Sequence, residues 1–166
     1  MQPTGFEILY EEGHCLVVNK PAGLLTQAPP GIDSLEVRLR RFLKAREAVD
    51  GNIYLALAHR LDRPVSGALI TSRNVRAARR LTEQFEMRTI DKRYWALIEG
   101  SPPDEAGTWF DNIRKVPDVA RAEVCEAGHP EGKPAELRFT VLGRFAEYTW
   151  LEIELLTGRM HQIRVQ

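Results

Sequence analysis

The chain has 166 residues, which suffice for one domain with a sizeable core and are too few for two of ordinary size. Its composition, 43% hydrophobic and 28% charged, is that of an ordinary soluble protein, and no apolar run approaches the roughly 18 residues of a membrane span. The N-terminus lacks the basic start and the apolar stretch of a signal peptide, so we expect a cytoplasmic protein. The formal net charge of zero argues against a uniformly basic nucleic-acid-binding protein.

The first part of the chain predicts a β-hairpin followed by a tight turn. Residues 6–12 and 14–19 have the pattern of two strands joined by a short turn. A second turn follows over residues 19–25, because Pro21 cannot donate a ladder hydrogen bond and Gly23 permits an unusual backbone angle. We interpret this second turn as scaffold, without a chemical role of its own.

A helix is expected next, ending at about Arg46. Asp33 or Ser34 is suited to cap its N-terminus, and Glu36, three residues after Asp33, suits a capping box. The apolar residues fall on one helical face, opposite the arginines, and are Leu35, Leu39, Phe42 and Leu43.

The middle of the chain predicts a strand, a polar turn, a strand and a helix. Residues 54–58 are expected to lead into the turn and residues 68–71 to leave it as a strand. Ser72 or Asn74 then caps a helix that ends at about Met87. The expected buried side of this helix consists of Ala78, Leu81 and Phe85.

Strands are also expected over residues 90–98, 136–145 and 148–156, the last two with clear alternation of apolar and polar residues. Residues 101–135 contain Pro, Gly and mixed charge with little periodicity. We expect an excursion loop there, with one short strand at residues 109–110.

The two cysteines, Cys15 and Cys125, are far apart in the sequence. Cys15 lies in an apolar run and is expected to be a small core residue, and no disulfide is expected in the cytosol. Cys125 and His129 have the spacing of metal ligands, but two candidates do not make a zinc site, so we expect no metal.

Basic residues form two clusters despite the zero net charge, one over residues 38–46 and the other over residues 73–93. Local stripes of this kind bind polyanions when the mean charge does not. Solvated helix faces explain the clusters equally well, so both interpretations stay open.

The stretch 58–68 sets opposed charges among turn residues, between two apolar segments. Asp62 lies between Arg60 and Arg63 and is expected to stay ionised, because nearby positive charge favours the charged form of a carboxyl group. Such an aspartate suits a nucleophile or a general base. The charge pattern by itself favours a simpler interpretation, a surface ion-pair cluster at the end of a strand.

Four segments of the chain favour a catalytic role for Asp62 over a surface ion-pair cluster. They are Lys20-Pro21-Ala22-Gly23, His59-Arg60-Leu61-Asp62 with the later Ser66-Gly67, Lys92-Arg93-Tyr94-Trp95-Ala96, and Thr157-Gly158-Arg159-Met160-His161-Gln162-Ile163-Arg164. Together and in this order they resemble the motifs of the RluA/RsuA-type RNA pseudouridine synthases. Val65 and Met160 depart from the threonine that is usual there, which removes a hydroxyl at each position.

The resemblance implies an α+β fold with a mixed, mostly antiparallel central sheet flanked by helices. It covers nearly the whole chain and implies a single catalytic domain over residues 1–166. Because the family's pattern continues past the last residue, we expect this domain to lack the family's last helix and strand. We expect no S4-like domain before Phe6 and therefore expect the catalytic domain itself to recognise RNA.

The resemblance further implies that the protein isomerises a specific uridine of rRNA or tRNA to pseudouridine. The base detaches from the ribose at N1, rotates, and rejoins it through C5. This reaction needs no cofactor, metal, redox step or phosphate donor, in keeping with a sequence that has no Gly-rich phosphate loop. We expect structured RNA as the partner, no membrane, and a monomer.

By the same resemblance, three residues carry the chemistry. Asp62 attacks C1′ of the ribose or otherwise stabilises the departing sugar. Arg164 forms a salt bridge that keeps Asp62 charged and aimed. Tyr94 stacks on the uracil and is a candidate general base for the 2′ proton.

The expected substrate-binding residues are Arg60, His59, Ile163 and Arg63. Arg60 is expected to fill the gap left when the uridine is flipped out, and Ile163 to pack against the uracil face. His59 and His161 are expected to have hydrogen-bonded structural roles and not to act as acid or base.

Two other classes of function stay open. One is a catalytically impaired RNA-binding module of the same fold, in which Arg164 lacks support and misplaces Asp62. The other is an enzyme that uses Asp62 to hydrolyse or cleave a nucleoside and so releases free uracil.

Overall fold

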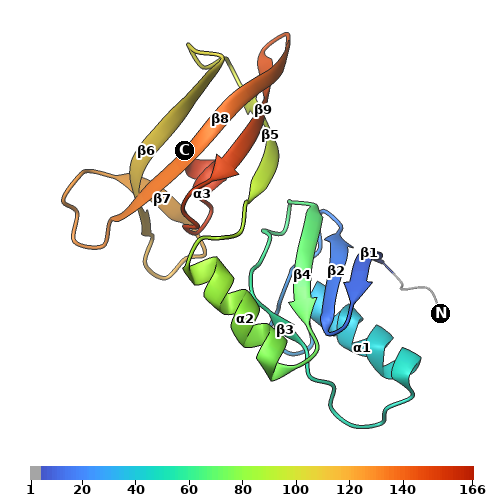
Figure 1. Cartoon of the computed structure of the whole chain (residues 1–166). Helices are drawn as coiled ribbons and strands as arrows, with labels where there is room; N and C mark the ends of the chain where they lie inside the picture. The colour runs from blue at the N-terminus through green and yellow to red at the C-terminus, as the bar shows by residue number, and fades with distance from the viewer. Residues whose placement is uncertain (1–4) are drawn as a thin grey trace. The chain divides into compact units, whose positions relative to one another are not determined.

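The computed structural model describes residues 5–166, which form two compact units, one up to Thr89 and one from Ile90 onwards. Each unit contains one antiparallel sheet (Figure 1). The predicted α+β class with mostly antiparallel pairing is confirmed, whereas the strands are divided between two sheets and are not gathered in one central sheet. No helix within residues 5–166 is both long and apolar enough to cross a membrane.

The first unit contains a four-stranded sheet in the order β1-β2-β4-β3. Its strands are β1 (Glu7–Glu12), β2 (Cys15–Lys20), β3 (Ala56–Leu57) and β4 (Gly67–Ser72). The predicted hairpin of β1 and β2 is confirmed. The strand expected over residues 54–58 is shorter than predicted, because it pairs only with the last two residues of β4.

Two helices, α1 (Leu35–Glu47) and α2 (Val75–Glu86), lie beside this sheet (Figure 1). Both begin where the sequence predicts a cap. The side chains of Ser34 and Asn74 each accept a hydrogen bond from a backbone N–H in the first turn of the helix that follows.

The predicted capping box at the start of α1 is wrong. Because Ser34 is the cap, Glu36 lies only two residues after it, one residue short of the capping-box position. Glu36 instead forms an ion pair with Arg40 at 2.8 Å, and Asp33 forms one with Arg38 at 2.6 Å. Both carboxylates therefore neutralise arginines of the helix.

Alternate residues of β2 form the buried face of the first sheet. Leu16, Val18 and Lys20 are fully buried. Their neighbours on β4 are buried as well, since Thr71 pairs with Leu16 and Leu69 pairs with Val18. The apolar stripe of α1 is buried as predicted and consists of Leu35, Leu39, Phe42 and Leu43. A lysine in this inward-facing row is unusual, since lysine is rarely fully buried unless its ammonium is paired.

The second unit contains a five-stranded sheet in the order β5-β9-β8-β6-β7 (Figure 1). Its strands are β5 (Arg93–Glu99), β6 (Ala106–Lys115), β7 (Ala122–Cys125), β8 (Lys133–Phe145) and β9 (Tyr148–Leu155). A short helix, α3 (Gln162–Val165), follows at the end of the chain.

The excursion loop predicted over residues 101–135 is wrong. Most of this segment is the hairpin of β6 and β7 and the first residues of β8. The prediction failed because β6 contains Gly107, Asp111 and Asn112, which have low strand propensity. Its strand conformation comes from continuous pairing with β8, whose residues lie far along the chain.

The core of the second unit forms on one face of β8 and β9. Its fully enclosed members are Leu137, Phe139, Leu151 and Ile153. Residues of the neighbouring strand β5 alternate between the two faces of the sheet. Its odd-numbered residues, including Trp95, are exposed, whereas the even-numbered residues Tyr94, Ala96 and Ile98 pack against this cluster.

Candidate active site

The loop that carries Asp62 is anchored by Thr26, a buried residue outside the loop. The Thr26 hydroxyl accepts a hydrogen bond from Leu61 N–H at 3.1 Å and donates one to the Leu61 carbonyl at 2.7 Å. The Val65 N–H donates to the Asp62 carbonyl at 3.0 Å and so closes a turn after it. The backbone on both sides of the half-buried Asp62 is therefore held.

The turn after β2 binds the same loop from its other end. Gly23 N–H donates to the Arg63 carbonyl at 2.7 Å, and Arg63 Nε donates to the Gly23 carbonyl at 3.0 Å. Gly23 has a φ of +83°, in the left-handed region that glycine adopts without strain. These reciprocal bonds make the turn a support for the Asp62 loop, in agreement with its interpretation as scaffold.

Lys20 at the start of this turn is fully buried. Its ammonium donates hydrogen bonds to the carbonyls of Pro21 at 2.9 Å, Leu24 at 2.7 Å and Arg63 at 3.5 Å. Each of its three protons thus has an acceptor, which offsets part of the cost of burying a charged group. The lysine fastens the turn to itself and to the residue next to Asp62.

Burial lowers the pKa of Lys20, and the negative charge of Asp62 opposes this shift. The ammonium and the carboxylate are therefore electrostatically coupled within the first unit. The sequence motifs indicate only a scaffold role for this turn and do not assign Lys20 to the site. The alternation of β2 is the signal that could have found it, because it places Lys20 on the same inward face as Leu16 and Val18.

The arginines and the histidine of the Asp62 loop differ in exposure. Arg60 and Arg63 are exposed, and Arg63 is tied to Gly23 as described. His59 is half-buried; its Nε2 accepts a hydrogen bond from Ile70 N–H at 3.0 Å, and its ring stacks on Phe85 with centroids 4.8 Å apart. The imidazole of His59 is thus built into the fold of the first unit.

Tyr94 and Ile163 pack against the same apolar cluster of the second unit. Tyr94 lies on β5 opposite Ile153 and is half-buried. Ile163 lies on α3, next to Arg164, whose side chain is exposed. The fold therefore brings Tyr94 and Ile163, which are distant in sequence, to one apolar cluster, and Arg164 follows Ile163 in the same unit.

Gln162 holds the segment that carries Ile163 and Arg164. Its Oε1 accepts hydrogen bonds from the Thr157 hydroxyl at 2.8 Å and from Arg159 N–H at 3.0 Å. Its Nε2 donates to the Glu136 carbonyl at 3.1 Å. Gln162 is 3% exposed, and its hydrogen bonds fix the backbone of this segment. The sequence did not indicate this role.

The predicted catalytic residues come from both units. Asp62 belongs to the first, and Tyr94 and Arg164 belong to the second. The salt bridge between Asp62 and Arg164 stays a prediction, as do the roles of Arg60, Tyr94 and Ile163.

Most arginines of the first basic cluster are paired with carboxylates. Arg38 pairs with Asp33, just before α1, and Arg40 pairs with Glu36 within the helix. Arg46 binds Glu11 at 2.8 Å, and the guanidinium hydrogen bonds lower the pKa of Glu11. The exposed arginines of α2 belong to the second cluster and are Arg76, Arg79 and Arg80. The first cluster thus has the character of a solvated, ion-paired helix face, and α2 retains more exposed positive charge.

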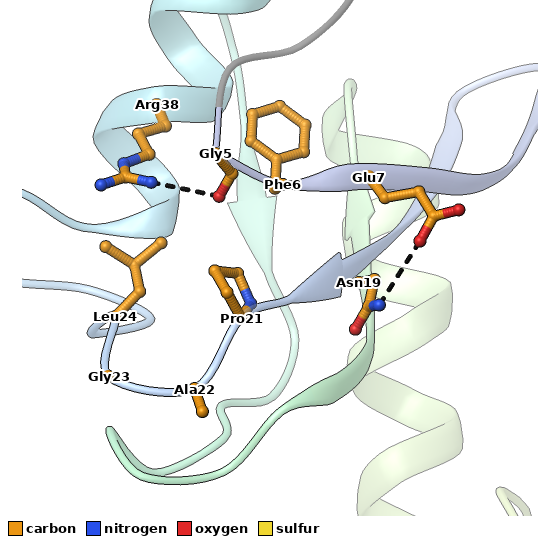
Figure 2. A pocket seen from close by; sticks show the side chains of 9 residues that line it. All are labelled: Gly5, Phe6, Glu7, Asn19, Pro21, Ala22, Gly23, Leu24 and Arg38. Atoms are coloured by element: carbon orange, nitrogen blue, oxygen red, sulfur yellow. Dashed lines mark hydrogen bonds between the residues drawn. The ribbon is translucent and has the colours of Figure 1, made fainter.

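A hollow of about 530 Å³ adjoins the turn that supports the Asp62 loop (Figure 2). Pro21, Ala22 and Gly23 form one side of it. Its polar side chains bind within the unit, since Arg38 donates to the Gly5 carbonyl at 3.1 Å and the Asn19 amide donates to Glu7 at 3.4 Å. The hollow is therefore a feature of the scaffold beside the loop.

Within residues 5–166, no three His, Cys, Asp or Glu side chains lie close enough together to hold a metal ion. Cys15 and Cys125 are both free thiols. The Cys125 thiol donates to the Asn112 carbonyl at 3.4 Å. Cys15 is half-buried and so is less enclosed than the core position that the sequence predicts.

Comparison with known proteins gives a consistent result. The model of the family described as "RNA pseudouridylate synthase" matches residues 14–166. "Ribosomal large subunit pseudouridine synthase C" of Vibrio cholerae is 35% identical over 160 residues, which are 95% of this chain and 47% of that protein. An "Uncharacterized RNA pseudouridine synthase" of Chloroflexus aurantiacus is 38% identical over 150 residues, 89% of this chain and 46% of that protein. The chain thus spans about half the length of the curated relatives it matches.

Two solved human structures share the fold. "RNA Pseudouridylate Synthase Domain Containing 4" superposes with a TM-score of 0.79 at 24% identity, over 96% of this chain and 62% of that one. "RNA Pseudouridylate Synthase Domain Containing 1" superposes with a TM-score of 0.73 at 28% identity, over 96% of this chain and 63% of that one. The arrangement of strands and helices described above is therefore that of pseudouridylate synthase domains.

Proposed function

Because this chain belongs to the RNA pseudouridylate synthase family, we propose that it isomerises uridine in RNA to pseudouridine with Asp62 as the nucleophile. The observation that carries this proposal is the way the Asp62 loop is held. Thr26 binds both backbone groups of the preceding residue, and the buried ammonium of Lys20 is coupled to the Asp62 carboxylate. A charged nucleophile on a bend that other residues keep rigid is suited to attack a sugar carbon.

The reaction proceeds by exchange of one glycosidic bond for another. The Asp62 carboxylate bonds to C1′ as the electron pair of the N1–C1′ bond leaves with the uracil. The uracil rotates, C5 bonds to C1′, and the ester to Asp62 breaks. The proton at C5 is lost to solvent and N1 gains one, so atoms and charge balance and no oxidant is consumed.

The remaining roles follow the family motifs. Arg164 pairs with Asp62 and keeps it ionised, and Tyr94 stacks on the uracil. Ile163 packs on the uracil face. Ile163 and Tyr94 pack against the same apolar cluster, which supports a shared binding surface for the base. Arg60, His59 and Arg63 complete the binding residues.

We propose rRNA of the large ribosomal subunit as the substrate, because several relatives are named for that RNA. The site of action is then the cytoplasm, where the protein works as a monomer without a metal. The test compares large-subunit rRNA and tRNA transcripts that carry tritium at C5 of uridine. Formation of the C5–C1′ bond releases the label, so tritium release from rRNA and not from tRNA is the expected result.

Two other outcomes contradict the proposed chemistry, and a third contradicts only the proposed substrate. RNA that is retained by the protein without release of tritium identifies an RNA-binding module that lacks activity. Free uracil in the product mixture identifies a nucleoside-cleaving enzyme. Tritium release from tRNA alone means that tRNA is the substrate, and the proposed isomerisation of uridine stands.

Thr26→Val is expected to lower kcat about tenfold while leaving KM unchanged. Valine has the shape of threonine but lacks the hydroxyl that binds both backbone groups of Leu61, so Asp62 loses its support. Thr71→Val is the matched control, because it removes an equally buried hydroxyl that donates to the Leu16 carbonyl in the sheet. Both variants are expected to lose about 1–3 kcal/mol of unfolding free energy. Equal loss of kcat in the two would contradict a positioning role for Thr26.

Arg60→Ala is expected to impair structured substrates selectively. The exposed guanidinium is proposed to fill the space of a flipped uridine, and a flexible single strand has no stack to replace. We expect KM for a stem-loop to rise about tenfold, equivalent to about 1.4 kcal/mol, with little change for an unstructured oligonucleotide. Arg41→Ala, which removes an exposed arginine from α1, is the control. Equal effects of Arg60→Ala on the two substrates contradict intercalation.

A further inference from the structure

A basic hollow of about 450 Å³ lies within the second unit, apart from the residues assigned to catalysis. It is enclosed by the end of β6, the start of β7 and β8, and the segment that precedes α3. Its charged lining comprises four cations and one carboxylate, namely Arg114, Lys115, Lys133, Arg159 and Glu131. A concave surface with an excess of positive charge favours an anionic ligand.

The four cations differ in how far their charge is compensated. Arg114 forms an ion pair with Glu123 at 2.6 Å. Arg159 Nε donates to the Pro134 carbonyl at 2.8 Å, a neutral acceptor that leaves its charge in place. Lys115 and Lys133 are exposed, and neither has an ion-pair partner within the described part of the chain. The charge of the hollow that is free to meet a ligand therefore resides mainly on these two lysines and Arg159.

The strands fix the spacing of the two lysines. Ile113 on β6 pairs with Lys133 on β8, and Lys115 lies two residues after Ile113, so both lysines project from the same face of the sheet. Lys115 also pairs with Ala122 on β7. Ile113 and Ala122 are each 3% exposed and form an apolar floor, on which Met160 packs. The cations thus stand on a rigid, hydrogen-bonded base.

Besides the strands, the hollow is lined by Gly158, Arg159 and Met160, in the segment that leads to Ile163 and Arg164. Gln162 accepts a hydrogen bond from Arg159 N–H and so ties this side to the start of α3. A ligand held by Lys115, Lys133 and Arg159 is therefore held at a constant position relative to the residues that we assign to uracil binding in this unit.

We propose that this hollow binds a backbone phosphate of the substrate RNA and thereby sets the position of the uridine. The inference rests on the proposed function for the identity of the RNA and on the charge and shape of the hollow for the contact. Ammonium and guanidinium groups on a fixed base bind phosphodiester oxygens without reading the bases. The hollow then contributes to RNA affinity and to the position of the RNA strand relative to the active site, and it does not take part in the chemical step.

The test measures binding of a labelled oligocytidylate, which contains no uridine and so reports binding without turnover. Lys115→Ala and Lys133→Ala are each expected to weaken binding about threefold to tenfold and to reduce the salt dependence of log K by about 0.7 for each lysine. Lys115→Arg and Lys133→Arg should retain binding, because the charge is kept. Arg121→Ala is the matched control, since it removes one exposed charge from the β6–β7 hairpin outside the hollow.

The proposal is overturned if the two alanine variants bind as Arg121→Ala does, or if the unmodified chain does not bind the oligocytidylate. In the tritium assay the same alanine variants should raise KM and leave kcat unchanged. If the unmodified chain releases tritium while the lysine variants bind normally, the hollow is excluded and the proposed function stands. If the lysine variants weaken binding while no tritium is released, the phosphate site stands and the proposed function fails.

Discussion

Asp62→Asn is expected to abolish tritium release from uridine-labelled RNA while leaving fold and RNA affinity intact. The amide has nearly the shape of the carboxylate but lacks the negative oxygen that bonds to C1′. Loss of the nucleophile is expected to lower kcat by about 10³-fold or more, which corresponds to at least about 4 kcal/mol of transition-state stabilisation. The measurements are single-turnover tritium release and RNA binding by fluorescence anisotropy.

Asp50→Asn provides the matched control for this change, because it makes the same substitution at an exposed residue of the first unit. It is expected to behave as the unmodified chain in both measurements. Retained turnover by Asp62→Asn, with the fold intact, would refute the nucleophile assignment and with it the proposed mechanism.

Lys20→Met is expected to have the second largest effect. Methionine fills a similar volume but donates no hydrogen bonds, so the carbonyls of Pro21 and Leu24 lose the Lys20 donor, whereas the Arg63 carbonyl keeps its hydrogen bond from Gly23 N–H. Unpaired buried carbonyls cost about 1–3 kcal/mol of unfolding free energy. Because the lysine also supports the Asp62 loop and is coupled to its carboxylate, we expect kcat to fall by more than about tenfold.

Urea unfolding and steady-state kinetics measure the two effects separately. Lys44→Met is the control, since it removes a half-exposed lysine of α1 that does not bind the Asp62 loop. It is expected to change neither quantity appreciably. A Lys20→Met variant that is destabilised but keeps its kcat would assign Lys20 to the fold alone and contradict its role in positioning Asp62.

The burial of Lys20 also predicts a pH dependence of stability. Its pKa is lowered in the folded state, so above that lowered value the unfolded chain binds more protons than the folded one. The contribution of Lys20 to the unfolding free energy therefore rises with pH between its folded pKa and the ordinary value of 10.5. Lys20→Met should remove this rise relative to the unmodified chain.

The local elements of the chain could be predicted from the sequence because their signals come from neighbouring residues. Ser34 and Asn74 cap their helices with side chains that reach only into the next turn. The alternation of β8 and β9 marks the face that each strand buries. The order of four short motifs indicates the family by itself, and one of these motifs contains Asp62.

The remaining features depend on contacts between segments that are distant in the sequence. β6 is a strand because β8 pairs with it, although its own residues have low strand propensity. Thr26 holds Leu61 across a large sequence separation, and Gln162 donates to the Glu136 carbonyl, which lies 26 residues earlier in the chain. No local pattern of hydrophobicity or charge encodes such partners.

The sequence by itself therefore determined the two longer helices, most strands, the family and the candidate catalytic residues of this protein. Only the tertiary structure decided which charges are buried, paired or free. It placed Lys20 inside the first unit and left Lys115 and Lys133 exposed around a hollow of the second. The physical reason is that the energy of a charged group depends on burial and on nearby charges and hydrogen bonds, and folding brings these from distant parts of the chain.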